Sequence, residues 1–379
     1  MHYFQYIDGK LFCEDIKVEE IAKEVGTPFY LYSMKTLRKH FIVFDNAFSS
    51  VPHIICFSVK ANSNIAVLKT FFSMGGGADV VSGGELYRAL KAGAPSEKIV
   101  YSGVGKTEEE IKYALNNNIL LFNVESEDEL YSLDRIAYKL KKKARIALRI
   151  NPDVDPHTHS YISTGLKENK FGIRAEEAKK MYIKARGLNN IEILGIDCHI
   201  GSQITKSEYF VHALKKLLSL IDDIKKEGIR IKFLDMGGGL GITYKDETPP
   251  DPIIYAREII SEIKDKDLIL ILEPGRVIVG NAGILVTKVL YTKKGEGKDF
   301  VIVDAGMNDL VRPSLYNSFH EIKPINQTER NEVIADIVGP ICETGDFFAK
   351  ERRIKEIFPG ELLAIMSAGA YGFTMSSNY

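Results

Sequence analysis

The chain has 379 residues, of which 45% are hydrophobic and 27% are charged, and its formal net charge at pH 7 is -1. This length allows a barrel plus a second module, while the near-zero charge argues against binding to nucleic acid or to an anionic membrane. No stretch approaches the length of a membrane span and no signal-peptide pattern is seen, so we expect a cytoplasmic protein.

Residues 1–34 are expected to form two short extended segments around a helix, followed by the alternating strand 29–32. From about residue 35 strands and helices alternate, which is typical of a parallel β/α architecture. The clearest helix is expected to begin at Ser207 as its N-cap and to end at Gly228. Eight strands are expected, at 53–59, 77–82, 98–102, 119–124, 145–150, 193–199, 231–236 and 268–273.

Eight strands with eight crossovers close most simply as a (β/α)8 barrel, and a doubly wound open sheet is the alternative. After residue 276 the alternation stops, and strands are expected at 284–291, 299–305, 332–338 and 361–367. The chain is therefore predicted to contain two domains. The barrel would span 35–276, and an all-β domain would combine 1–34 with 277–379.

Polar residues end nearly every expected strand of the barrel, where the working residues of such a fold lie. These residues are Lys60, Asp79, Ser102, Glu125, Arg149, His199, the glycines at 237–239 and Glu273. Desolvation at the end of a buried strand can remove the proton of a lysine and make its amine a nucleophile. The alternative is a lysine that extends its charge into solvent.

The glycine run at 237–239 follows the seventh expected strand, where backbone N–H groups can approach a phosphate closely. Barrels commonly bind phosphate between the loops after strands seven and eight, and residues 274–276 follow strand eight. A flexible turn is the alternative interpretation. Because both loops lie at one end of the barrel, a phosphate site is predicted there.

Three other motifs do not match their templates. Residues 103–107 end like a Walker A loop, but Val100 stands where that template requires glycine. Ile242 likewise breaks the dinucleotide-binding pattern of the glycine run. His157 and His159 have no third spaced ligand, so no metal site is predicted.

The lysine, the phosphate loop, a histidine and a carboxylate together describe a pyridoxal phosphate site. The flat ring of His199 can stack on an aromatic cofactor, while Ser202 adds a phosphate donor. The carboxylate of Glu273 would keep a pyridine nitrogen protonated, which makes the ring an electron sink.

The sequence resembles the diaminopimelate decarboxylases, which belong to the alanine-racemase-like, fold type III class of pyridoxal phosphate enzymes, over essentially its whole length. Ornithine and arginine decarboxylases share several of the motifs. The motifs that carry the resemblance lie at 59–62, 79–86, 199–203, 237–241 and 273–276, and the segments 305–316 and 339–346 resemble versions specific to diaminopimelate decarboxylases. The resemblance implies a homodimer that converts meso-2,6-diaminopimelate to L-lysine and CO2, the last step of lysine biosynthesis.

The resemblance also implies a role for each matching residue. Lys60 would bind the cofactor covalently with Asp79 nearby, and Cys342 would donate the proton. Cys342 and Glu343 would come from the partner subunit. The other residues that would hold the cofactor are His199, Ser202, Gly238, Gly239, Glu273, Gly275, Arg276 and Tyr371. Those that would bind the substrate are Arg276, Arg312, Tyr316, Glu343 and Tyr371.

The charges of these residues suit a substrate with two amino-acid ends. A guanidinium binds the remote carboxylate and a carboxylate binds the remote ammonium. Ordinary surface ion pairing is the alternative for the same side chains. Three other functions remain open at this point: decarboxylation of ornithine, arginine or carboxynorspermidine, racemisation of an amino acid, and non-enzymatic binding of pyridoxal phosphate. Turnover that does not depend on Arg312 would indicate the first of these.

Overall fold

The computed structural model describes residues 2–155 and 169–379, so His157 and His159 lie outside the described residues. The chain divides into two compact units. One unit contains Phe41–Gly241 and Thr248–Val277, and the other contains Met1–His40, Ile242–Glu247 and Ile278–Tyr379. None of the helices in the described ranges is both long and apolar enough to cross a membrane.

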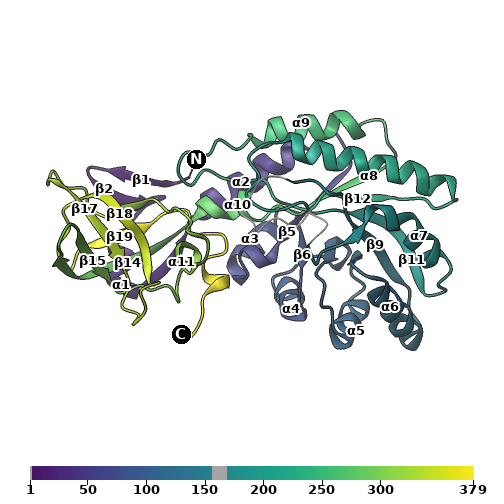
Figure 1. The fold of residues 1–379 in the computed structure, drawn as a ribbon, viewed down its shortest axis with the longest axis horizontal. Coiled ribbons are helices and arrows are strands. Elements are labelled where there is room, and N and C mark those ends of the chain that lie inside the picture. The colour runs from purple at the N-terminus through teal and green to yellow at the C-terminus, as the bar shows by residue number, and fades with distance from the viewer. Residues whose placement is uncertain (1, 156–168) are drawn as a thin grey trace. The chain divides into compact units, whose positions relative to one another are not determined.

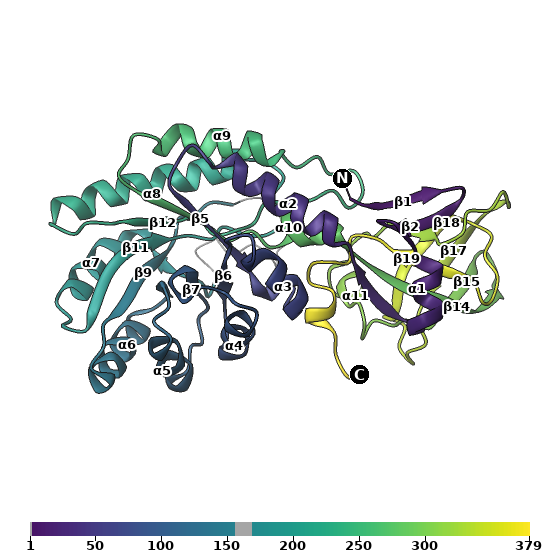
Figure 2. The same ribbon diagram turned by 180° about the vertical axis from the view of Figure 1, so that it is seen from behind.

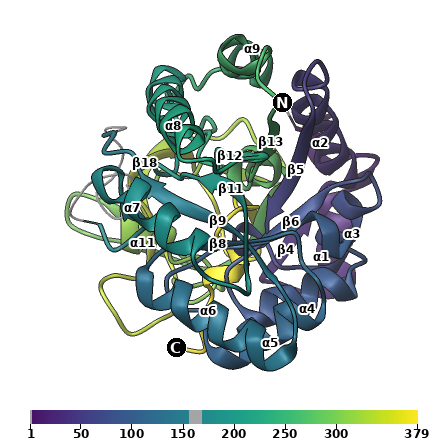
Figure 3. The ribbon, with the colours of Figure 1, turned by 90° about the vertical axis from the view of Figure 1, so that its right-hand side faces the viewer.

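The first unit is a closed barrel of eight parallel strands, which Figure 3 shows surrounded by helices. The last strand pairs with the first, and this closure rules out the open doubly wound sheet. A short additional strand, β10 (Ile173–Arg174), pairs with β9. The barrel strands are β5 (His53–Ser58), β6 (Gly77–Val80), β7 (Ile99–Tyr101), β8 (Leu121–Val124), β9 (Ala144–Asn151), β11 (Ile191–Asp197), β12 (Phe233–Asp235) and β13 (Ile269–Leu272). All eight expected strands are thus confirmed.

Helices follow the strands and cover the outside of the barrel. Several begin with a side-chain cap, as Ser82, Thr107 and Ser126 each accept a backbone N–H of the first turn. The helices are α2 (Met34–Ala47), α3 (Ile65–Phe72), α4 (Gly83–Lys91), α5 (Glu108–Asn116), α6 (Glu127–Leu140), α7 (Ala175–Arg186), α8 (Glu208–Lys226) and α9 (Pro252–Ile263).

The expected capping of α8 by Ser207 is wrong, although the helix itself lies where it was expected. Ser207 precedes the helix with φ -69° and ψ -23°, and its side chain makes no capping hydrogen bond. These angles are already helical, whereas a capping residue has extended backbone angles that turn its oxygen toward the first N–H groups. The apolar stripe of α8 is buried as expected, with Phe210, Leu214 and Leu217 in the core.

The second unit contains a seven-stranded sheet and a small three-stranded sheet, visible in Figures 1 and 2. The larger sheet contains β4 (Phe29–Tyr32), β14 (Gly283–Lys294), β15 (Asp299–Val303), β16 (Ile322–Pro324), β17 (Glu332–Val338), β18 (Phe347–Lys355) and β19 (Leu362–Ile365). The smaller sheet contains β1 (Phe4–Ile7), β2 (Lys10–Cys13) and β3 (Ile16–Lys17). The N-terminal strand β4 pairs with β14, so the two ends of the chain form one β structure, as expected.

Side chains alternate between two cores along β14, as the pleat of a strand requires. Ile284 and Val286 pack with the small sheet and with Val18 of helix α1 (Val18–Val25). Leu285 and Val289 face the opposite cluster, formed with β15, β17 and β18. The large sheet is therefore covered on one face by the N-terminal segment.

Two strands and one extended piece of the second unit differ from the expectation. The N-terminal segment forms three short strands before its helix rather than one. Strands β16 and β18 were not expected. β18 carries the charged run Lys350–Arg353 and lies at the edge of the sheet, where charged side chains are tolerated and hide the alternation of a buried strand.

Candidate active site

A layer of polar side chains lies inside the barrel at the C-terminal ends of its strands. Parallel register places Ser58 of β5 opposite Asp79 of β6, and it places Asp197 of β11 between Arg149 of β9 and Asp235 of β12. A buried apolar layer belongs to the same strands, formed by Cys56, Val100, Leu121, Ala147, Phe233 and Ile271. Strand geometry therefore gathers ionisable groups that are far apart in the sequence.

Lys60 follows β5 on a single 3-10 turn, Val59–Ala61, and its amine points to the polar layer. Nζ forms an ion pair with the buried carboxylate of Asp79 and lies 3.3 Å from Ser58 Oγ. Ser58 Oγ in turn contacts Asp79 Oδ2 at 2.7 Å. The expected position of Lys60 at the mouth of the barrel, next to Asp79, is confirmed.

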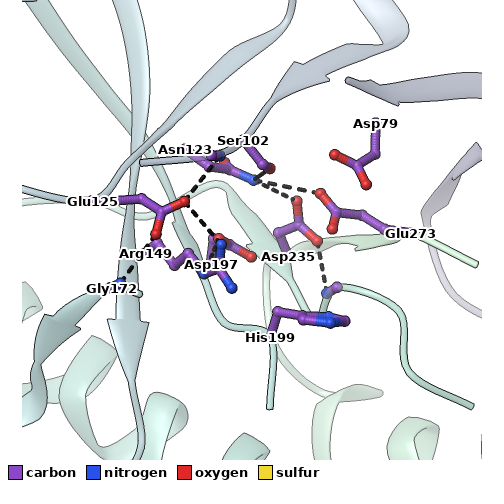
Figure 4. Close-up of polar contacts among 12 residues, drawn as sticks. Asp79, Ser102, Asn123, Glu125, Arg149, Gly172, Asp197, His199, Asp235 and Glu273 are labelled. Carbon is purple, nitrogen blue, oxygen red and sulfur yellow. Dashed lines mark hydrogen bonds and ion pairs between the residues drawn. The ribbon is translucent and has the colours of Figure 1, made fainter. Parts of the chain in front are cut away.

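The amide of Asn123 links two carboxyl groups in the layer (Figure 4). Its Nδ2 donates to Ser102 Oγ at 3.0 Å, to Asp235 Oδ2 at 3.3 Å and to Glu273 Oε1 at 3.5 Å. Asp235 Oδ1 also accepts the N–H of Gly237 at 2.9 Å. Glu273 directly follows β13, so the last strand of the barrel presents its carboxyl to this amide.

Two carboxyl groups of the polar layer, those of Asp235 and Glu273, have raised pKa values. Burial raises the pKa of Asp235 to about 8, with a further rise from Asp197 and opposition from the hydrogen bonds of Gly237 and Asn123. Burial also raises the pKa of Glu273 well above its ordinary value, and Asp235 adds to that rise. Because these groups share one region, at pH 7 the pair holds protons that exposed carboxyls would lose.

The opposite side of the layer is held by a cation. Arg149 Nη1 contacts Glu125 Oε1 at 2.8 Å, and its Nε lies 3.9 Å from Asp197 Oδ2 (Figure 4). The guanidinium also lies over the ring of Phe171 at 4.9 Å. Burial raises the pKa of Asp197 well above its ordinary value, followed by the effect of Glu273, and the charge of Arg149 opposes this rise.

His199 lies two residues beyond β11, next to the glycine loop. Its Nδ1 accepts the N–H of Gly238 at 3.2 Å, which fixes the tautomer that carries hydrogen on Nε2. Burial lowers the pKa of His199 well below its ordinary value, and the charges of Arg149 and Lys60 act in the same direction. The imidazole is therefore neutral at pH 7.

The glycine loop packs too closely against its neighbours to accept side chains. A Cβ atom on Gly238 would lie 2.2 Å from the carbonyl oxygen of Glu273, and one on Gly239 would lie 2.4 Å from that of Gly201. Gly239 also has φ +111°, a value that favours glycine. Beside this loop Arg276 donates to Ser202 Oγ at 3.0 Å, and Gly275 is buried directly before it.

A cavity of about 390 Å³ opens at this end of the barrel. It is lined by Lys60, Val81, Ser102, residues 103–105, Arg149, Phe171, Asp197, His199 and Glu273. The structure thus brings together the lysine, the histidine and the carboxylate that the sequence singled out. Ser202, Arg276 and the glycine loop belong to the same unit.

The remaining expected site residues lie in the second unit. Arg312 begins the short helix α11 (Arg312–Tyr316) and is buried. Its guanidinium lies over the rings of Tyr244 at 5.1 Å and Tyr316 at 5.8 Å, and its Nε donates to His320 Nε2 at 3.4 Å. Because the ring of His320 is fixed by a 2.8 Å hydrogen bond to the carbonyl of Met366, the guanidinium is held in one orientation.

Cys342 and Glu343 lie on an exposed turn that a buried carboxylate organises. Asp346 accepts the N–H of Ile341 at 2.7 Å and the N–H of Met307 at 2.7 Å. It therefore ties the turn that contains Ile341 to the segment that contains Met307. Both Cys342 and Glu343 are exposed. Tyr371 has φ 54° and is half-buried.

Four residues of the polar layer were missed from the sequence as parts of the site. Ser58, Asn123, Asp197 and Asp235 occupy positions within strands rather than beyond them. The available signal was a polar residue inside a short apolar run, as in Leu121–Val124. A buried polar group of this kind needs partners, and the partners come from other strands.

Comparisons with known proteins agree on one family. Residues 34–280 match the family model described as pyridoxal-dependent decarboxylase, pyridoxal binding domain. A protein of Aquifex aeolicus (strain VF5) named diaminopimelate decarboxylase is 52% identical over 381 aligned residues, which cover 100% of this chain and 90% of that protein.

Solved structures are similar over nearly the whole chain. Diaminopimelate decarboxylase from Helicobacter pylori, complexed with L-lysine, is 45% identical with a TM-score of 0.92, covering 95% of this chain and 91% of that one. The structure of diaminopimelate decarboxylase from M. jannaschii in co-complex with L-lysine is 39% identical with a TM-score of 0.94, covering 99% and 90% respectively.

The raised pKa of Asp235 predicts that the stability of the fold depends on pH. Since its pKa in the folded chain is about 8, against an ordinary 3.8, its contribution to stability is complete below the ordinary pKa and is lost as pH rises through 8. From pH 5 to 8 the free energy of unfolding of the cofactor-free protein should fall relative to Asp235→Asn, by up to about 1.4 kcal/mol per pH unit. Denaturant titrations across this range measure the difference, and parallel profiles would contradict it.

Proposed function

The chain belongs to the diaminopimelate decarboxylases of the pyridoxal-dependent decarboxylase family, and from this premise we propose that it converts meso-2,6-diaminopimelate to L-lysine and CO2. This is the last step of lysine biosynthesis, and CO2 leaves from the D-configured centre. The observation that carries the proposal is the cavity that Lys60, His199 and Glu273 line together.

The residues present fit pyridoxal 5'-phosphate. The loop at Gly238 and Gly239 packs against the carbonyl oxygens of Glu273 and Gly201 with no room for a Cβ atom, and a loop without side chains lets a phosphate approach its backbone. We propose that Ser202, Gly275, Arg276 and Tyr371 complete the phosphate site. When bound, the cofactor supplies an electron sink for the electron pair that the departing CO2 leaves behind.

Within the cavity we assign a separate task to each side chain. Lys60 would hold the cofactor covalently through Nζ, and Asp79 orients that amine through its ion pair. Glu273 would keep the pyridine nitrogen protonated, and the ring of His199 would stack on the cofactor. The neutrality of His199 supports this task, because a neutral imidazole adds no positive charge that would oppose a protonated pyridine ring.

The distal amino-acid end of the substrate is assigned to Arg276 and to four residues of the second unit. Arg312 would bind its carboxylate with Arg276, and Glu343 would bind its ammonium, with Tyr316 and Tyr371 alongside. The fixed guanidinium of Arg312 supports this role, since its packing on Tyr244 and its bond to His320 restrict it before any substrate arrives. Cys342 Sγ would give its proton to the carbon that has lost CO2.

We also propose that the enzyme is a cytoplasmic homodimer whose active sites are shared. The four cysteines are free, which is usual in a reducing compartment. Cys342 and Glu343 lie on an exposed turn, where a second copy of the chain can meet them. In a two-fold dimer such a contact occurs twice, so each barrel would receive the turn of its partner. On this proposal the domain of 1–34 with 277–379 supplies substrate and dimer contacts to the barrel of 35–276.

Substrate selectivity tests the assigned activity. The wild-type protein should release CO2 from meso-2,6-diaminopimelate and not from ornithine or arginine. Arg312→Ala should lower kcat/KM for diaminopimelate, because the substrate carboxylate loses its buried partner. The loss should correspond to about 2–5 kcal/mol of transition-state free energy, while cofactor absorbance stays unchanged.

The matched control is Arg353→Ala, since the side chain of Arg353 is 76% exposed and pairs with Glu332 at 3.6 Å on the surface. This variant should keep wild-type turnover. Preferred release of CO2 from ornithine would refute the proposed substrate. Unchanged turnover by Arg312→Ala would refute only the role of that arginine.

Mixed dimers test the shared site. If Lys60→Ala and Cys342→Ala subunits exchange, each hybrid dimer should contain one site with both lesions and one with neither. With random assortment half the dimers are hybrid and half of their sites are intact, so roughly a quarter of wild-type activity should return. A pull-down through a tag on one subunit verifies exchange, and inactive hybrids would show that Cys342 does not act across the dimer.

A further inference from the structure

The segment 103–107, which resembles a phosphate loop but lacks its glycine, contains a lysine with an unusual environment. The side chain of Lys106 is 1% exposed and that of Glu129, its ion-pair partner at 2.7 Å, is 9% exposed. Nζ also donates to the carbonyl oxygens of Gly103 and Asn123, each at 2.8 Å. The three donors of the ammonium group therefore each have an acceptor.

The same loop is tied from its other side by a second charged group. Glu125 Oε1 accepts the N–H of Gly103 at 2.9 Å and contacts Arg149, while Glu125 Oε2 accepts the N–H of Gly172 at 3.1 Å. The backbone N–H of Glu125 is in turn bound by Glu129 Oε2 at 2.9 Å. The N–H of Gly103 is thus bound by Glu125, and its carbonyl oxygen is bound by Lys106. Glu129 connects these two residues, since it contacts both Lys106 and the backbone of Glu125.

This network reaches the cavity at two points. Residues 103–105 line the cavity together with Lys60 and Glu273. Asn123, whose carbonyl accepts from Lys106, donates its side-chain amide to Asp235 and Glu273 (Figure 4). Lys106 itself does not line the cavity, so its effect on chemistry must pass through these neighbours.

Stability alone does not account for a buried ion pair of this kind. Apolar side chains of similar volume are often as stabilising as a buried pair, because both charges must first lose their water. The ammonium group of Lys106 fixes the direction of two backbone carbonyls through hydrogen bonds, which an apolar side chain cannot form. One of these carbonyls belongs to a wall of the cavity, and the other belongs to the residue that contacts Glu273.

We propose that Lys106 is a positioning residue for the decarboxylation, which fixes the loop 103–105 as a rigid wall of the cavity and holds Asn123 in contact with Glu273. This inference rests on the proposed function, and it assigns the 103–107 segment a role that phosphate binding does not explain. Glu129 is the partner that keeps the ammonium in place, since its carboxylate bridges Lys106 and the backbone of Glu125.

The test compares the holoenzyme with Lys106→Met, which keeps an unbranched side chain one atom shorter and removes its charge. We expect kcat/KM to fall at least about tenfold, and we expect the amides of residues 102–107 to exchange hydrogen at least about tenfold faster. The other barrel strands should exchange at the wild-type rate. Titration of the cofactor-free protein with pyridoxal phosphate should also show weaker binding, since Asn123 no longer fixes Glu273.

Two further variants separate positioning from folding. Lys106→Met leaves the Glu129 carboxyl buried without a cation, so Lys106→Met combined with Glu129→Gln removes both charges and should restore the melting temperature while loop exchange stays fast. Lys112→Met is the matched control, because Lys112 lies on the neighbouring helix α5 in exposed ion pairs with Glu108 and Glu109. It should leave exchange and kcat/KM unchanged.

Wild-type loop exchange and wild-type kcat/KM in both Lys106 variants would overturn the proposal. A uniform increase of exchange over the whole barrel, with activity falling only in proportion to the folded fraction, would also overturn it and indicate a purely structural lysine. If the wild-type protein released no CO2 from diaminopimelate, the proposed function would fail, whereas loop exchange and cofactor titration would still decide the role of Lys106.

Discussion

The barrel depends on keeping a layer of charged groups inside a sheet that has little access to water. An isolated carboxylate in such a place costs several kcal/mol, so each one must gain a cation, a proton or a donor. Lys60 supplies a cation to Asp79, and Arg149 supplies one near Asp197. Asn123 donates to the pair that keeps its protons. Five carboxyl groups of the barrel are buried, those of Asp79, Glu125, Asp197, Asp235 and Glu273.

This constraint explains why the same residues serve both the fold and the chemistry. A lysine that pairs with a buried carboxylate at the edge of a cavity is oriented without being fully enclosed, as the half-exposed side chain of Lys60 shows. The close approach of Gly238 to the carbonyl of Glu273 joins the glycine loop to the same layer. The site is therefore built on rigid strand ends, and the loops between them are tied down by buried charges such as Lys106.

The sequence predicts the barrel and its strand ends well, because periodic apolar runs and the polar residues after them are local signals. It does not reveal Asn123 or Asp197 as members of the site, since their importance comes from register between strands far apart in the chain. The sequence also predicts wrongly that Ser207 caps helix α8, because the backbone of Ser207 is already helical. It misses strand β18, whose charged side chains lie at a sheet edge. The roles proposed for Cys342 and Glu343 would involve a second copy of the chain, and both residues lie on an exposed turn where such a copy can meet them.

On the proposed function, the polar layer of the barrel presents Lys60 as the amine that holds pyridoxal phosphate. Borohydride reduction of the purified holoenzyme, followed by digestion and mass spectrometry, identifies this amine, because reduction makes the bond between amine and cofactor permanent. We expect one modified peptide, with the cofactor on Lys60, and no such label in Lys60→Ala. A label on any other lysine of the wild-type protein would contradict this expectation.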